Sequence, residues 1–231
     1  MNHSEPQCAP IRPLGERLSA LPRTKAASTA GLTGLFFAAY FFAQRHPFFP
    51  VTTVPAGPLD RWIGFHPDAI VIYLSLWVYV SLGVALMGDG TELFHYWAAS
   101  GALAVAGVAC FFAFPTAVPH GLAEWSPSSP WAFLGKDTGN ACPSLHAAFA
   151  LFTAAAIDPV LRETGRSKLR AVNFVWSAAI VWSTLAIKQH VIIDAIAGAA
   201  LGAGAAAFYR KLRLGRRASR MTTPTPPITT A

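Results

Sequence analysis

The chain has 231 residues, of which 53% are apolar and only 13% are charged, and its mean hydropathy is +0.41. Soluble proteins carry about 25% charged residues, so these values exclude a cytosolic enzyme, a disordered tail protein and a secreted disulfide scaffold. The three scattered cysteines are also too few for a disulfide scaffold. The net charge of +7 is gathered in two tails and one loop, a distribution that argues for a membrane protein and against nucleic-acid binding.

The first predicted membrane span lies within Ala26–Gln44, which carries no charge. A span takes about 20 helical residues, and no signal-peptide cleavage site follows this one, so we expect it to be retained. The next segment, 46–67, contains five prolines that prevent a continuous helix. Within it, residues 59–63 are expected to form a short interfacial turn in which Asp60 and Arg61 make a local loop pair.

Five further spans are predicted, at Ala69–Met87, Leu93–Phe114, Pro143–Ile157, Val172–Ile187 and His190–Tyr209. Pro143 suits the first helical position, because proline lacks only an N–H that would be unpaired there. The Pro- and Ser-rich segment 115–142 separates the third and fourth spans, and its Trp125 and Trp131 suit the aromatic belt at a membrane interface.

These spans predict an all-α, polytopic membrane protein: a six-helix transmembrane bundle, 26–209, between an N-terminal tail, 1–25, and a basic, disordered C-terminal tail, 210–231. With the N-terminus inside, 14 of the 18 Lys and Arg residues lie on the inner side. The positive-inside rule therefore predicts that both termini are cytoplasmic. Segment 115–142, the start of the fourth span and the corner at 188–190 then meet at the outer face.

Polar residues in membrane spans are costly and indicate function. One group of them stands at 140–146, Asn-Ala-Cys-Pro-Ser-Leu-His, where the fourth span begins. Ser144 and His146 lie in or near its first turn, where free N–H groups and the positive end of the helix dipole can bind an anion.

A second group stands at the start of the sixth span. His190 and Asp194 are four residues apart, so they share one helix face. The carboxylate can hold the tautomer of the imidazole and stabilise a cation or a covalent adduct. Lys188 adds a positive charge that a phosphate would compensate.

The Pro-Ser-x-His element at 143–146 and the Ser-x6-His-x3-Asp element at 183–194 resemble the second and third signature motifs of the type 2 phosphatidic acid phosphatase / haloperoxidase superfamily. The resemblance covers roughly residues 70–209. It implies a six-helix membrane enzyme with its active site near the outer face and with no metal or other cofactor. It also implies a role for each motif residue. His190 is the nucleophile that forms a phosphohistidine, and Asp194 supports it. His146 is the general acid, and Ser144 contacts the phosphate.

Two features depart from the family pattern. Ser183 is followed by Thr184 where the family usually has Arg, and Lys188 can replace that charge but not its bidentate geometry. The first motif, a Lys and an Arg-Pro seven residues apart, is not found before the fourth span. His120, which follows a proline, and Lys136 are only loose substitutes.

The residue sequence Cys-Pro-Ser-Leu-His, together with Ser-Thr-x4-Lys-Gln-His, resembles the inositolphosphotransferase branch of the superfamily. This branch includes inositol phosphorylceramide synthase-like and sphingomyelin synthase-like proteins. This resemblance shifts weight from hydrolysis toward transfer onto an alcohol. The implied function is that of an integral-membrane lipid phosphate phosphatase or phosphotransferase. The implied partners are a lipid phosphate, membrane lipids and a water or alcohol acceptor, while the lipid, the acceptor and the oligomeric state stay open.

Two readings of other classes compete with this function. In one, His146 and His190 are axial ligands of a haem or copper in a cofactor-binding membrane protein, although Asp194 and Lys188 suit an anion better than a metal. In the other, the protein is a transporter or a non-catalytic phosphate-binding module. The excess of Arg over Lys and the many Ala and Gly residues indicate a bacterial source, and hence a cytoplasmic membrane with the site facing the periplasm or exterior.

Overall fold

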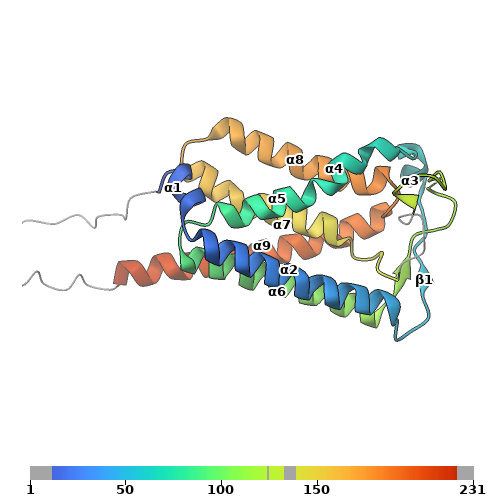
Figure 1. Cartoon of the computed structure of the whole chain (residues 1–231), viewed down its shortest axis with the longest axis horizontal. Coiled ribbons are helices and arrows are strands. Elements are labelled where there is room, and N and C mark those ends of the chain that lie inside the picture. The colour runs from blue at the N-terminus through green and yellow to red at the C-terminus, as the bar shows by residue number, and fades with distance from the viewer. Residues whose placement is uncertain (1–11, 124, 133–138, 223–231) are drawn as a thin grey trace, which may run out of the picture.

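The protein is a bundle of long helices that run side by side (Figure 1). A computed structural model of the chain describes residues 12–123, 125–132 and 139–222. In this part of the chain, six segments are helical, long and apolar enough to cross a membrane: Pro22–Arg45, Pro67–Ala85, Gly90–Ala113, Leu145–Glu163, Ser167–Ala186 and Ile192–Arg216. The prediction of an all-α, six-helix membrane protein is confirmed.

The helices and strands follow one another as α1 (Leu14–Ser19), α2 (Pro22–Arg45), β1 (Thr52–Thr53), α3 (Pro58–Ile63), the 3₁₀ turn η1 (Pro67–Ala69), α4 (Ile70–Leu74), α5 (Leu76–Ala85), α6 (Gly90–Ala113), β2 (Thr116–Ala117), α7 (Leu145–Glu163), α8 (Ser167–Ala186) and α9 (Ile192–Thr222). The second span is thus made of three consecutive helical pieces, η1, α4 and α5. The short turn predicted over 59–63 is present as α3.

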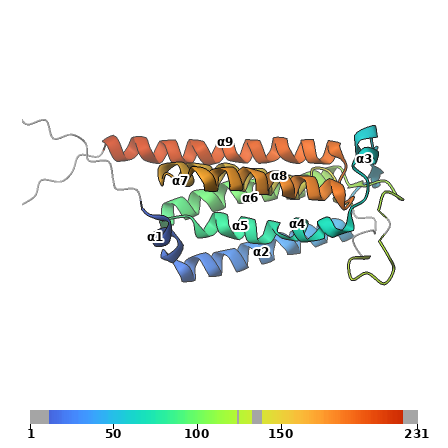
Figure 2. The same ribbon diagram turned by 90° about the horizontal axis from the view of Figure 1, so that it is seen from above.

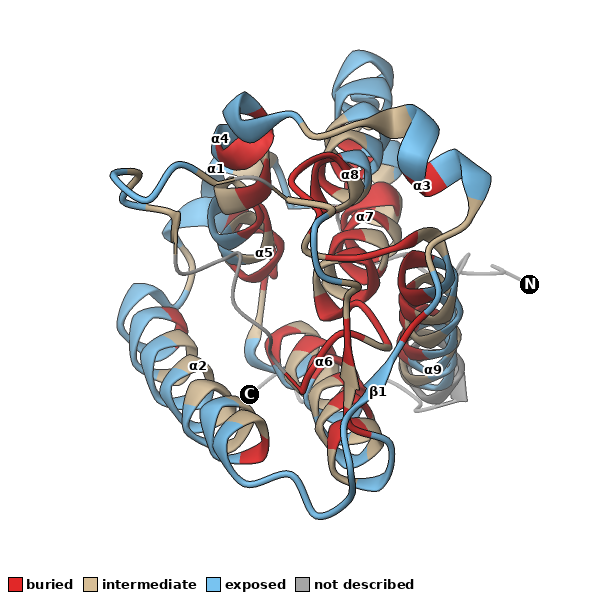
Figure 3. Cartoon of the chain, turned by 90° about the vertical axis from the view of Figure 1, so that its right-hand side faces the viewer, coloured by how far each residue is buried: buried red, intermediate tan, exposed pale blue. Residues whose placement is uncertain are grey.

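Helix α7 is the centre of the bundle. The buried share of its span is 61%, whereas that of α2 is 6%. Small residues make this burial possible, because Ala147, Ala148, Ala150 and Ala154 let neighbouring helices approach the α7 backbone. Figure 3 shows α7 among α5, α8 and α9, while α2 stands at the edge with an exposed surface.

Two glycines on α9 bring this helix against α7. A Cβ atom added at Gly198 would lie 2.2 Å from the carbonyl oxygen of Ser144, and one added at Gly202 would lie 2.5 Å from that of Ala148. Both distances are too short for real atoms, so the two backbones approach as closely as they do only because neither position has a side chain. The start of α9 is thereby fixed against the start of α7.

The two ends of the bundle differ in character (Figure 2). We call the end that carries α3, β1 and β2 the loop end, and the opposite end, where α1 and the last turns of α9 lie, the terminal end. At the loop end, β1 pairs in parallel with β2, and Thr116 of β2 bridges to Asn140. These short pairings tie the segments before α3 and before α7 together.

The terminal end is held by ion pairs that involve both predicted tails. Arg17 of α1 lies 2.7 Å from Glu92, and Arg216 of α9 lies 2.5 Å from Asp89. Arg213 pairs with Glu163 at the end of α7, at 3.2 Å. These contacts hold the basic last turns of α9 against α6 and α7. Helix α9 therefore continues to Thr222, whereas the sequence predicted a disordered tail from residue 210.

Two helix starts at the loop end also differ from the prediction. Pro143 precedes α7 and is not its first residue, because Ser144 caps the helix and Leu145 begins it. His190 precedes α9, which begins at Ile192, because the chain turns sharply at Lys188 with a left-handed φ of 58°. Both histidine motifs therefore combine a helix start with the loop just before it.

Candidate functional site

The site is built first on the start of α7. The Ser144 side-chain oxygen accepts a hydrogen bond from the Ala147 N–H at 3.3 Å, so Ser144 is the N-cap of this helix. His146 is the second helical residue and lies within the first turn. Backbone N–H groups of a first turn that have no partner within the helix favour anions, and anion binding by this segment stays a prediction.

The corner between α8 and α9 forms the second part. The N–H groups of Gln189 and His190 both donate to the Thr184 carbonyl, at 3.1 and 3.2 Å, and this closes the end of α8. His190 is buried, with 7% of its surface exposed. The motif residues Ser183 and Thr184 are fully buried, and their backbone carbonyls thus serve to hold the corner.

Asp194 lies beneath His190 in the first turn of α9. Its Oδ2 accepts a hydrogen bond from the Val191 N–H at 3.0 Å and lies 3.6 Å from Nδ1 of His190. The second distance is longer than a hydrogen bond, although such contacts in ligand-free catalytic sites are often long. The pair is adjacent, as the spacing of four residues predicts.

The two motifs meet through the close packing of α7 and α9. The Ser144 N–H donates to the backbone carbonyl of Asp194 at 2.9 Å. The ring centroids of His146 and His190 are 6.4 Å apart. Two segments that are more than forty residues apart in the chain therefore place two imidazoles and one carboxylate in a single site.

Aromatic side chains enclose His146. The Tyr73 ring stacks on the imidazole with centroids 4.0 Å apart and an interplanar angle of 16°. Trp77 meets the same ring edge to face at 6.0 Å. These two residues come from α4 and α5, so the second span fixes the plane of His146 although it contributes no charged group to the motifs.

Three polar atoms of the site are buried without a hydrogen-bond partner among the described residues: His146 Nε2, His190 Nδ1 and Asp194 Oδ1. Buried polar atoms are almost always paired in native proteins. Of these atoms, Nε2 of His146 can take a partner from a substrate, whereas Nδ1 of His190 faces the Asp194 carboxylate at 3.6 Å.

Asp60, interpreted from the sequence as half of a local loop pair, belongs to this region. Its side chain is buried, and its Oδ1 accepts a hydrogen bond from the Ile192 N–H at 2.8 Å. Its backbone carbonyl accepts one from Nζ of Lys188 at 2.5 Å. No local pattern could reveal these contacts, because they join α3 to residues about 130 positions later.

Lys188 itself is buried at the corner. Burial lowers the pKa of its ammonium below the ordinary lysine value, and the negative charge of Asp60 raises it in part. Lys188 is therefore held beside His190 by a neighbour that the sequence analysis did not associate with it.

The segment before α7 is fixed by Thr116. Its hydroxyl oxygen accepts a hydrogen bond from the Cys142 N–H at 2.7 Å. Burial, and then the charge of Asp194, raise the pKa of the Cys142 thiol to about 11. Cys142 is thus a protonated thiol beside the site.

Loop residues cover the corner from the loop end. Trp125 and Trp131, expected in an aromatic belt, pack with Ile63 against the buried cluster of Ala69, Ile70, Tyr73, Ala186 and Ile187. Of the two substitutes considered for the first motif, His120 is exposed in the loop after β2, and Lys136 falls outside the described residues.

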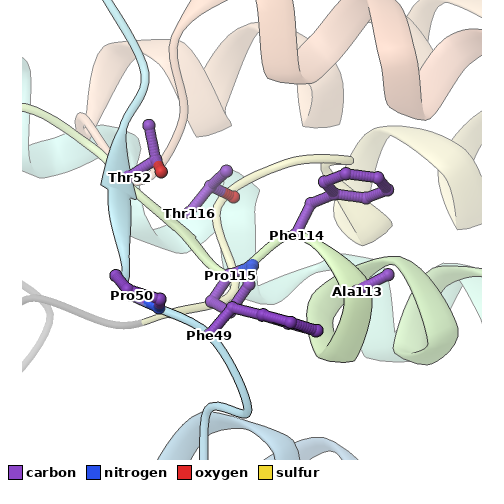
Figure 4. Close-up of a pocket in the computed structure, with 7 residues that line it drawn as sticks. All are labelled: Phe49, Pro50, Thr52, Ala113, Phe114, Pro115 and Thr116. Carbon is purple, nitrogen blue, oxygen red and sulfur yellow. The ribbon is translucent and has the colours of Figure 1, made fainter.

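A separate apolar pocket of roughly 660 Å³ lies at the loop end beside the last turn of α6 (Figure 4). Seven residues line it: Phe49, Pro50, Thr52, Ala113, Phe114, Pro115 and Thr116. None of the predicted site residues lines this pocket, so we do not assign the chemistry to it. In the described part of the chain, no group of three His, Cys, Asp or Glu residues is arranged to hold a metal ion.

Comparison with known proteins gives one match. The model of a family described as the PAP2 superfamily matches residues 61–208, more than half of the chain. The matched region contains both histidine motifs and begins one residue after Asp60. No curated protein and no solved structure matches the chain.

Proposed function

The chain belongs to the PAP2 superfamily, and we propose that it is a membrane phosphatase or phosphotransferase that acts on lipid phosphates through a phosphohistidine intermediate. The observation that carries the proposal is the hydrogen bond from the Ser144 N–H to the Asp194 carbonyl, together with the 6.4 Å separation of His146 and His190. These contacts bring together a helix start suited to an anion, a buried His-Asp pair and a second histidine. Phosphoryl transfer requires such groups to position the phosphate and to stabilise its charge.

In the first step, Nε2 of His190 attacks phosphorus. The N–P bond forms, the bond from phosphorus to the leaving oxygen breaks, and His146 donates a proton to that oxygen. Asp194 stabilises the positive charge that develops on the His190 ring.

In the second step, the acceptor oxygen attacks phosphorus, the N–P bond breaks and His146 takes the acceptor's proton. The first turn of α7, which Ser144 caps, and the ammonium of Lys188 hold the phosphoryl oxygens in both steps. Water as the acceptor gives a phosphatase, and a lipid or polyol hydroxyl gives a transferase. The residue sequence of segment 142–146 resembles that of the inositolphosphotransferase branch and therefore favours an alcohol as the acceptor.

We place the site at the outer face of a bacterial cytoplasmic membrane. The site lies at the loop end of the bundle, away from α1 and the last turns of α9. Most of the Lys and Arg residues belong to the terminal end, which the positive-inside rule assigns to the cytoplasm. A lipid in the outer leaflet would then present its head group to His190.

The function is tested by incubating the purified protein with a panel of phospholipid and isoprenoid phosphates, with and without candidate alcohols. We expect vanadate-sensitive turnover, and the ratio of free phosphate to transferred head group separates hydrolysis from transfer. The covalent step is tested by acid-quenched labelling with a phosphate-labelled lipid, which should yield an acid-labile, base-stable phosphoprotein.

His190→Ala should abolish both turnover and labelling, whereas Asp194→Asn should stay folded and turn over slowly. A matched control is His46→Ala, because this exposed histidine at the loop end of α2 contacts only its own helix through the Phe42 carbonyl and the Phe42 ring among the described contacts. Wild-type turnover in His190→Ala would disprove the phosphohistidine route and leave direct displacement by the acceptor.

A further inference from the structure

Asp60 makes contacts that a local loop residue does not need. Only 3% of its surface is exposed, although it lies on the six-residue helix α3. Its Oδ2 accepts a hydrogen bond from the Gly57 N–H at 2.8 Å, which closes the start of α3. Its other carboxylate oxygen, Oδ1, is used for a residue of α9.

The bond to α9 holds the helix that carries Asp194. The Ile192 N–H donates to Oδ1 of Asp60 at 2.8 Å. This N–H belongs to the first turn of α9, where N–H groups have no partner within the helix. Figure 2 shows α3 lying across this end of α9. The carboxylate thus fixes the helix two residues after His190.

A third contact reaches Lys188. Its Nζ donates to the Asp60 carbonyl at 2.5 Å, and its backbone adopts a left-handed φ of 58°, which is uncommon for a residue with a Cβ atom. An ammonium has three donors, so two remain for a phosphate. Asp60 therefore binds both flanks of His190: the lysine before it and the helix start after it.

We propose that Asp60 is a positioning residue of the reaction, which holds Lys188 charged and aimed at the phosphate and holds the start of α9 beneath His190. This inference rests on the proposed function. It adds a residue that lies outside both histidine motifs. It also gives α3 a part in phosphate binding, because the positive charge of Lys188, which Asp60 holds, replaces part of the charge that an Arg after Ser183 would supply.

The charge of Asp60 gives the proposal a signature that packing alone would not produce. Burial lowers the pKa of Lys188 and the charge of Asp60 counteracts this. The titratable and charged groups on the elements that pack here are Asp60 and Arg61 of α3, His66 before η1, Asp68 of η1, Tyr73 of α4, and His190 and Asp194 at the corner. Of these, Asp60 is the group whose charge raises the pKa of Lys188.

The experiment measures kcat and KM against pH for the wild type and Asp60→Asn with whichever lipid phosphate the wild type turns over. The amide keeps an oxygen for the Ile192 N–H but removes the charge. We expect KM to rise about tenfold, the loss of one charge-assisted contact, and the alkaline limb of kcat/KM to move to lower pH, because Lys188 then loses its proton earlier. Asp68→Asn, which changes an exposed aspartate at the same end, should behave like the wild type.

A lysine-to-arginine background separates charge from packing. A guanidinium stays charged at any pH of the assay, so adding Asp60→Asn to Lys188→Arg should leave the alkaline limb where Lys188→Arg alone has it. If Asp60→Asn does not fold, as judged by its thermal unfolding in detergent, Asp60→Glu is used. Its extra methylene should raise KM while the alkaline limb stays at the wild-type pH.

The outcomes are distinct. A wild-type protein that turns over no lipid phosphate overturns the proposed function itself. If the wild type is active and Asp60→Asn keeps the wild-type KM and alkaline limb, the role of Asp60 alone is overturned. Where Asp60→Glu is needed instead, unchanged kinetics in that variant overturn the same role. In Asp60→Asn, an equal loss at every pH with no movement of the alkaline limb also overturns it, because that is the result of a purely structural contact.

Discussion

Individual residues of the site differ in what their surroundings allow them to do. His146 is stacked on Tyr73 and has an unpartnered Nε2 among the described residues, so its ring plane is fixed while one nitrogen is available. His190 lies two residues after Lys188 and has Asp194 below it. The centroids of the two rings are 6.4 Å apart.

The role of His146 as general acid predicts a dependence on the leaving group. His146→Ala should slow turnover by roughly 10²–10⁴-fold for lipid phosphates with poor leaving groups. It should slow turnover much less for an activated aryl phosphate, whose leaving oxygen needs no proton. Measuring kcat for both substrates checks this, and equal losses on both would contradict the role.

Ser144 acts differently, because it caps α7 and holds no proton for transfer. Ser144→Ala should weaken the binding of the substrate phosphate and leave residual turnover. The expected loss of helix stability is about 1 kcal/mol, the usual cost of removing an N-cap. Ser144→Asp retains a cap but adds negative charge, and it should bind phosphate less well than Ser144→Ala in a competition assay with vanadate.

The raised pKa of Cys142 predicts slow alkylation. A thiol with a pKa of about 11 is almost entirely protonated at pH 8, and only the thiolate reacts. In a variant in which Cys8 and Cys110 are replaced by serine, the rate of iodoacetamide modification should still be rising at pH 9.5. Adding Asp194→Asn removes the nearby charge and should shift the profile to lower pH, and an unchanged profile would contradict this account.

At the scale of elements, the contact between α7 and α9 builds the site. Each helix carries one histidine motif at its start, and Gly198 and Gly202 let the two backbones touch. The short pairings of β1 with β2, and the bond from Cys142 to Thr116, then fix the loop that enters α7. The second span adds the aromatic residues that orient His146.

This contact predicts different results for glycines of the same helix. Gly198→Ala places a Cβ against the Ser144 carbonyl and should destabilise the fold by about 1–3 kcal/mol, with a larger loss of kcat because the two motifs move apart. Gly204→Ala meets no atom within 4 Å and should be neutral or slightly stabilising. Thermal unfolding in detergent and turnover of both variants check this, and equal behaviour would contradict the proposed contact.

At the scale of the whole molecule, the two ends of the bundle have separate tasks. The loop end holds the histidines, Asp60 and the covering tryptophans. The terminal end holds α1 and the basic extension of α9, with Arg17, Arg213 and Arg216 in ion pairs. The bundle is long enough to keep these two ends on opposite sides of a membrane, since it contains six segments of spanning length.

The separation of the two ends predicts the orientation of reporter fusions. A fusion at Ser126 should report an outer location, and fusions at Arg166 and after Thr222 should report an inner one, because basic loops stay inside. Lys136, also expected outside, lies beyond the described residues and serves as a second outer position. An alkaline phosphatase and green fluorescent protein pair measures this, and an outer Arg166 would overturn the orientation.

The amino-acid sequence by itself determined the class of protein, and it predicted which residues form the candidate site. Uncharged runs of about 20 residues predicted the six spans, because only a helix satisfies its own backbone in a membrane. The His190 and Asp194 spacing predicted their adjacency, because helix periodicity is a local property. Boundaries were less predictable. Helix α7 begins after Pro143 because Ser144, rather than the proline, occupies the N-cap position. Helix α9 runs past Tyr209 because Arg213 and Arg216 form ion pairs with other segments of the chain.

Only the tertiary structure decided which distant segments meet. The approach of Ser144 to Asp194 depends on two glycines facing another helix, the stacking of Tyr73 on His146 depends on where the second span packs, and the contacts of Asp60 join α3 to α9. Sequence spacing carries information about neighbours along one helix, whereas contacts between helices are selected by the packing of the whole bundle. For this reason the sequence indicated a local loop residue at Asp60, whereas in the fold Asp60 binds Lys188 and Ile192 on either side of His190.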